Sequence, residues 1–142
     1  MSLDPALLRQ SFDIVVEREP ELTLRFYDVL FSRFPQAKSL FAGTTVKRQA
    51  EMLQGALVAV LEHLEDASWL VSTLGGLGQK HVAYGVTTEM YGWVGESLIA
   101  TLAEAAGDAW TPELEGAWAE AYGAITGLML DGAAKEPLTR AS

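Results

Sequence analysis

The chain has 142 residues, 49% hydrophobic and 20% charged, a balance that predicts one globular domain with a sizeable core. Its formal net charge of −9 disfavours nucleic acids and anionic membrane surfaces as partners, because both attract basic proteins. The absence of cysteine excludes disulfides, zinc–thiolate sites, iron–sulfur clusters and cysteine nucleophiles.

Seven helical segments, six long and one short, are predicted in chain order. In each long segment apolar residues recur at helical spacing, as Leu8, Phe12 and Val15 do in the first. Prolines precede four of the segments, where a missing N–H costs nothing. The predicted helices span residues 4–19, 20–34, 35–40, 46–64, 68–82, 89–106 and 112–134, with loops at 43–45, 85–88 and 107–110. No alternating strand pattern occurs, so we expect an all-α single domain over residues 1–142, with a frayed tail over 135–142.

No signal peptide is visible at the N-terminus, and no apolar stretch approaches the length of a spanning helix. Together with the lack of disulfides, this predicts a cytoplasmic protein.

Only two histidines are present, and His81 is the one with a candidate chemical role. It follows Leu74 and Leu77 at spacings of seven and four, which places its imidazole on the apolar face of its helix. A neutral imidazole there can bind a metal through one nitrogen while the other donates to a backbone carbonyl. The alternative is a histidine that fills the core or caps the helix. His63, beside Glu62 near the end of another helix, is expected to be a solvated surface residue.

Two further polar residues lie in line with apolar stripes. Tyr27 stands among aromatic residues of the second helix, either as a hydrogen-bond donor or as a core tyrosine whose hydroxyl reaches the surface. Gln49 lies one turn before Leu53, either as a donor or at the wet end of the stripe. The Gly76-Leu77-Gly78 triplet is rejected as a dinucleotide motif, because no strand precedes it.

Taken together, these residues resemble the globin family. The resemblance is carried by residues 26–31, by 34–41 and by 77–86, and the 32-residue separation between Gln49 and His81 matches the family's distal and proximal positions. It covers roughly residues 5–133 and looks closest to bacterial single-domain haemoglobins related to the globin domains of flavohaemoglobins. It implies a globin fold of six to seven helices around one haem b (iron protoporphyrin IX).

The resemblance also implies a role for each matched residue. His81 would be the proximal iron ligand, and Tyr27 and Gln49 the distal residues that stabilise a bound gas. The other implied haem contacts are Phe41, packed on the haem face, Leu53 on the distal side, and Leu77 and Val86 on the proximal side with Tyr91 below His81. Lys80 would contact a propionate, with Lys47 and Arg48 as further propionate candidates.

The function implied by the resemblance is reversible, high-affinity O₂ binding at ferrous iron, with NO and CO as other ligands. Two distal donors would slow O₂ release, which suits scavenging or nitric-oxide chemistry better than bulk oxygen transport. The alternatives are a nitric-oxide dioxygenase served by a separate reductase, and a globin-fold sensor or interaction module. The sequence leaves the oligomeric state open, and its acidic charge would favour a reductase with a basic docking face.

One departure from the flavohaemoglobin pattern concerns the proximal side. In that pattern a tyrosine and a glutamate near the proximal histidine push electron density towards the iron. Tyr91 matches the tyrosine, but Ala133 stands at the glutamate's place. Asp131, two residues earlier, belongs to another helix face, roughly 200° away. We therefore expect this push to be weakened.

Overall fold

The computed structural model describes residues 4–135, which form six α-helices and two short 3₁₀ helices without a strand. In chain order these are α1 (Pro5–Arg18), α2 (Leu22–Arg33), η1 (Pro35–Phe41), α3 (Val46–Glu62), α4 (Ala67–Ala83), α5 (Thr88–Ala106), η2 (Gly107–Ala109) and α6 (Pro112–Lys135). The all-α prediction is confirmed, and every predicted helix ends within two residues of its expected position. The short helix η2 lies inside a predicted turn. The predicted frayed tail falls outside the described residues, apart from Lys135 at the end of α6.

Side chains at the helix starts explain why the helices begin where they do. The Asp4 carboxylate accepts a hydrogen bond from the Leu7 N–H at 3.1 Å, and the Thr45 hydroxyl accepts one from the Arg48 N–H at 3.1 Å. The predicted cap at residues 43–45 is thus present. At the other end of α5, Gly107 adopts a φ of +56°, which ends the helix in the conformation that glycine tolerates best.

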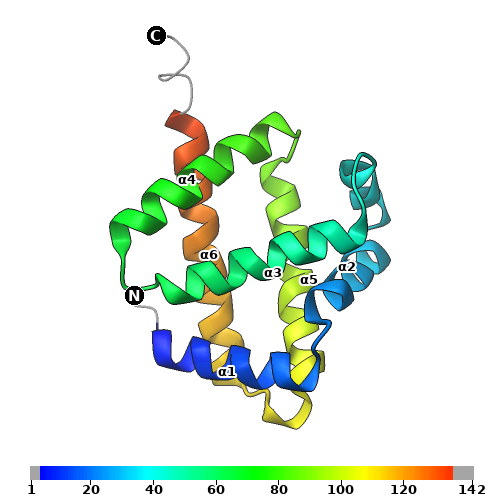
Figure 1. Ribbon diagram of the computed structural model, residues 1–142, viewed down its shortest axis with the longest axis vertical. Coiled ribbons are helices and arrows are strands. Elements are labelled where there is room, and N and C mark those ends of the chain that lie inside the picture. Colours follow the sequence, from blue (N-terminus) through cyan, green and yellow to red (C-terminus); the bar gives the residue numbers. More distant parts are fainter. Residues whose placement is uncertain (1–3, 136–142) are drawn as a thin grey trace.

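Helix α6 runs along the length of the molecule and contacts α1 and α4 towards its two ends (Figure 1). Near its start it meets α1, where the indole N–H of Trp118 donates to the Ser11 hydroxyl at 2.9 Å. Near its end it meets α4, the helix that carries His81. Within residues 4–135, no helix is long and apolar enough to cross a membrane.

The apolar interior is divided into two clusters, although a small domain usually has one contiguous core. The larger, which we call the first cluster, gathers buried residues of α1, α2, η1, α3, α5 and α6 around Phe26, Tyr27 and Leu30. The second cluster consists of Val60, Leu74, Tyr91 and Met129, with partly buried neighbours that include Leu77 and Val86. The predicted distal and proximal residues are therefore distributed between two apolar sets, both of which pack against Leu64.

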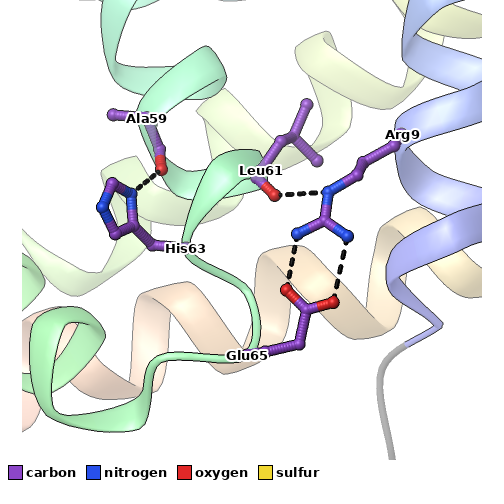
Figure 2. A network of polar contacts seen from close by, with 5 residues as sticks. All are labelled: Arg9, Ala59, Leu61, His63 and Glu65. Atoms are coloured by element: carbon purple, nitrogen blue, oxygen red, sulfur yellow. Dashed lines mark hydrogen bonds and ion pairs between the residues drawn. The ribbon is translucent and has the colours of Figure 1, made fainter.

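An arginine ties α1 to the end of α3 and to the loop before α4 (Figure 2). The Arg9 guanidinium donates to the Leu61 carbonyl at 2.8 Å and makes two hydrogen bonds to the Glu65 carboxylate, at 3.0 and 2.6 Å. This fork geometry holds the pKa of Glu65 below its usual value, chiefly through the hydrogen bonds from Arg9. The contact fixes the junction between the helix that bears Gln49 and the helix that bears His81.

His63 lies at this junction, and here the sequence prediction of a solvated surface residue is wrong. The side chain is half-buried, and its Nδ1 lies 2.7 Å from the Ala59 carbonyl oxygen (Figure 2). Its ring stacks on Trp69 with centroids 3.9 Å apart and planes 9° from parallel. The reason is that α3 ends at Glu62, so His63 turns back over the first turn of α4 and covers the indole.

Candidate functional site

His81 lies in the last turn of α4, half-buried, with a backbone partner for one ring nitrogen. Its Nδ1 is 2.9 Å from the carbonyl oxygen of Leu77, one turn earlier. Because a carbonyl can only accept, Nδ1 is the nitrogen that carries the proton, and Nε2 keeps a free lone pair. The local structure therefore prepares one nitrogen of His81 for a Lewis acid and fixes the ring through the other.

Tyr91 is the neighbour of this imidazole on α5. The two ring centroids are 6.2 Å apart and the planes are inclined by 24°. The Tyr91 side chain is buried, which raises the pKa of its phenol, and its hydroxyl has no hydrogen-bond partner among the described residues. The Tyr122 hydroxyl donates to the Tyr91 carbonyl at 2.6 Å and so anchors this part of α5 to α6. Leu77 and Val86 pack against the same cluster as Tyr91.

Tyr27 lies in the first cluster, surrounded by three phenylalanine rings. Its ring centroid is 4.9 Å from that of Phe26, 5.9 Å from that of Phe31 and 5.5 Å from that of Phe41. Burial raises the pKa of the Tyr27 phenol to about 12, so the hydroxyl keeps its proton at neutral pH. Burial is the cause of this shift, without a contribution from a hydrogen bond to the described residues, so the hydroxyl is available to donate to a ligand.

Gln49 and Leu53 are half-buried on α3, on the same side of the helix and one turn apart. Leu53 packs against the first cluster. The Gln49 amide nitrogen is 3.4 Å from the Thr44 hydroxyl and 4.0 Å from the Met52 sulfur, both long contacts. The amide is thus held only weakly, and a rotation of its side chain would free it as a donor.

The two clusters together offer what a large, flat, apolar cofactor with a metal at its centre requires. One set supplies a neutral phenol and phenylalanine edges, and the other supplies an imidazole nitrogen and aliphatic side chains. Four of the predicted contact residues pack against a cluster and yet stay only partly buried: Phe41, Leu53, Leu77 and Val86. A haem between the clusters would complete their burial, so the donor set and the apolar surroundings fit that group.

The structure also locates the basic residues predicted to contact haem propionates, and the position at which the flavohaemoglobin pattern has a glutamate. Lys47, Arg48 and Lys80 are all exposed. Asp131 is exposed as well, and Ala133 lies one turn beyond Met129, which belongs to the cluster of Tyr91. The structure therefore gives Tyr91 no carboxylate partner among the described residues, in line with the departure expected from the sequence.

Sequence reasoning missed one contributor to this side of the molecule. The bond from the Tyr122 hydroxyl to the Tyr91 carbonyl joins residues 31 positions apart. Helical periodicity identifies which face is buried and does not reveal such a partner.

Comparisons with known proteins agree with this arrangement. Residues 24–129 match the family model described as Globin. The flavohemoprotein of Bordetella pertussis is 34% identical over 127 residues, which cover 88% of this chain and 32% of that protein. The flavohemoprotein of Vibrio cholerae is 32% identical over the same length. The chain thus spans about a third of the length of the curated relatives that it matches.

Among solved structures, similarity is found to an engineered carbene transferase built on a candidate nitric oxide dioxygenase of Rhodothermus marinus. The TM-score is 0.82 and the identity 26%, with 99% of this chain and 100% of the other covered. With the family model matching well over half of the residues, the chain belongs to the globin family.

Proposed function

We propose that this globin binds haem b between its two apolar clusters, with His81 as the proximal ligand. The observation that carries the proposal is the bond between His81 Nδ1 and the Leu77 carbonyl, because a ring held through Nδ1 presents Nε2 to a metal, beside Tyr91 of the second cluster. The names of the flavohemoprotein relatives support the same cofactor. A bound haem would supply an iron able to take diatomic gases on the face opposite the histidine.

The residues on the distal and proximal sides of the haem would then have different roles. On the distal side the neutral Tyr27 phenol donates a hydrogen bond to the outer atom of a gas ligand, and Gln49 adds a second when its amide turns inward. Phe41 and Leu53 exclude water, which strengthens both bonds. On the proximal side Leu77 and Val86 support the ring, and Lys80 reaches a propionate from the surface.

The function that we infer is high-affinity, reversible O₂ binding, with slow release. Two features support it: a buried distal donor that stays protonated, and a proximal histidine whose observed partner is a carbonyl and not a carboxylate. A carbonyl accepts the hydrogen bond from Nδ1 less strongly than a carboxylate would, so it raises the basicity of the imidazole less. A less basic proximal ligand favours holding a gas over activating it.

A second candidate, nitric-oxide dioxygenation with a separate reductase, is favoured by the similarity to the Rhodothermus marinus protein. Nitric-oxide consumption by the purified protein, with and without an added flavin reductase, separates the two functions. Reductase-dependent consumption over many turnovers would favour the dioxygenase, and a single stoichiometric loss would favour the O₂ binder.

The cofactor is tested by the absorption spectrum of the purified protein, before and after reduction and addition of CO. We expect a Soret band that shifts in both steps, and we expect His81→Ala to abolish or greatly weaken haem retention. His63→Ala is the control, because it removes the other histidine, whose Nδ1 faces the Ala59 carbonyl, and it should retain haem. A colourless wild type that takes up no added haem would overturn the proposal.

A further inference from the structure

Helices α4 and α6 cross with their backbones in direct contact, at three glycines. A Cβ placed on Gly78 would overlap the carbonyl group of Met129, and one placed on Gly132 would overlap the backbone of Gly75. In the other direction, a Cβ on Gly75 would lie 3.4 Å from the Cα of Gly132. No side chain separates the two helices here, so backbone atoms alone set their spacing.

A side-chain hydrogen bond holds the same crossing in register. The Gln79 amide nitrogen donates to the Gly132 carbonyl at 3.1 Å, between residues 53 positions apart. The crossing is thus fixed in two ways: the glycines determine how closely the helices approach, and Gln79 determines how far one is shifted along the other. Close packing transmits such a constraint, because a packed backbone contact cannot be compressed.

This crossing lies within one turn of the candidate iron ligand. Gly78 precedes His81 by three residues, so the two positions are separated by roughly 60° around the helix axis. Leu77, whose carbonyl orients the His81 ring, immediately precedes Gly78. A shift of α4 away from α6 at Gly78 would therefore move His81 and its orienting carbonyl together. Part of that movement would be opposite to the direction in which the imidazole projects, so the imidazole would be drawn back.

We propose that Gly78 is a positioning residue for His81: its missing side chain lets α4 rest on the Met129 carbonyl and thereby sets how far the imidazole reaches towards a bound haem iron. This inference rests on the proposed haem function. Alanine at this position would force α4 back by about 1 Å or more to restore an ordinary carbon–oxygen contact of about 3.3 Å. The iron–histidine bond would lengthen and weaken.

A neighbouring glycine provides a matched control. Gly76 lies on the same helix two residues earlier, and a Cβ there meets nothing within 4 Å. Gly76→Ala and Gly78→Ala therefore make the same chemical change with the same gain in helix propensity, but only the second one obstructs the crossing.

The experiment compares wild type, Gly76→Ala and Gly78→Ala after each is loaded with haem. We expect the iron–histidine stretching band in the resonance Raman spectrum of the ferrous, ligand-free form to move to lower frequency in Gly78→Ala alone. Haem transfer to an excess of a haem-scavenging acceptor should be about 10- to 100-fold faster in that variant, the range found when the support of a metal ligand is removed. A band and a transfer rate equal to those of Gly76→Ala would overturn the inference.

Gln79→Met covers the case in which Gly78→Ala does not fold, as judged by circular dichroism. It removes the bond to Gly132 without adding volume, so a smaller shift of the same band in the same direction supports the inference, and an unchanged band overturns it. Failure of the wild type itself to bind haem would remove the proposed function and the inference together. Failure of Gly78→Ala to differ, in a wild-type background that binds haem, removes the inference alone.

Discussion

Replacing Tyr27 by phenylalanine separates ligand stabilisation from fold stability. The phenol is buried among Phe26, Phe31 and Phe41, and burial, without a hydrogen bond to the described residues, raises its pKa. If that hydroxyl donates to bound O₂, its loss costs about 1 to 1.5 kcal/mol of ligand stabilisation. At about 1.4 kcal/mol per factor of ten, O₂ should dissociate about 5- to 13-fold faster from Tyr27→Phe. Stopped-flow displacement of O₂ by CO measures this rate.

The free energy of unfolding should depend little on the Tyr27 hydroxyl and more on the Tyr122 hydroxyl. Because Tyr27 gives up no hydrogen bond to the protein, Tyr27→Phe should change the free energy of unfolding by less than about 1 kcal/mol. The Tyr122 hydroxyl bonds the Tyr91 carbonyl at 2.6 Å, so Tyr122→Phe should cost about 0.5 to 1.5 kcal/mol while leaving O₂ dissociation nearly unchanged. An O₂ dissociation rate in Tyr27→Phe equal to that of the wild type would refute the distal role.

Two further predictions concern the fold that holds the site. Trp118→Phe breaks the buried bond to Ser11 and leaves a smaller ring in the core, so it should lower the free energy of unfolding in urea by about 1 to 3 kcal/mol. Trp110→Phe, which loses only an exposed indole contact, should cost less, and equal losses would contradict the assignment. The Arg9–Glu65 pair should make unfolding pH-dependent. Because Arg9 lowers the folded-state pKa of Glu65, its contribution is complete above the ordinary glutamate pKa of about 4.3 and is lost as pH falls through the lower folded-state value. The stability advantage of wild type over Arg9→Met should therefore shrink in acid to the part that the Arg9–Leu61 bond contributes, and an advantage that stays the same size after Glu65 is protonated would argue against it.

The helices were predictable because their information is local. Apolar residues such as Leu8, Phe12 and Val15 recur with the period of a helix, and all three are buried. Capping residues such as Asp4 and Thr45 mark the starts through bonds to backbone three residues on. Each of these signals lies within one or two turns of the chain, where sequence spacing and spatial distance agree.

The features that sequence reasoning could not provide depend on a second helix or on the rotation of a side chain. The contact of Gly78 with Met129 is invisible in a pattern that only records which face is apolar, since a glycine on such a face is equally compatible with open space. His63 was misjudged for the same reason: its cover comes from Trp69, on the next helix. The direction of the Gln49 amide is set by contacts to Thr44 and Met52 that depend on side-chain rotation.

The divided core connects these observations to function. Tyr27, Phe41 and Leu53 belong to one apolar set, and Leu77, Tyr91 and Val86 to another. A cofactor between them would act as part of the core, so its binding energy would also be folding energy for α3 and α4. The backbone contact at Gly78 holds α4 against α6, and the Arg9 contacts hold α1 at the α3–α4 junction. They would preserve the spacing of Tyr27 and His81 before haem arrives, so less conformational entropy would be lost when haem binds.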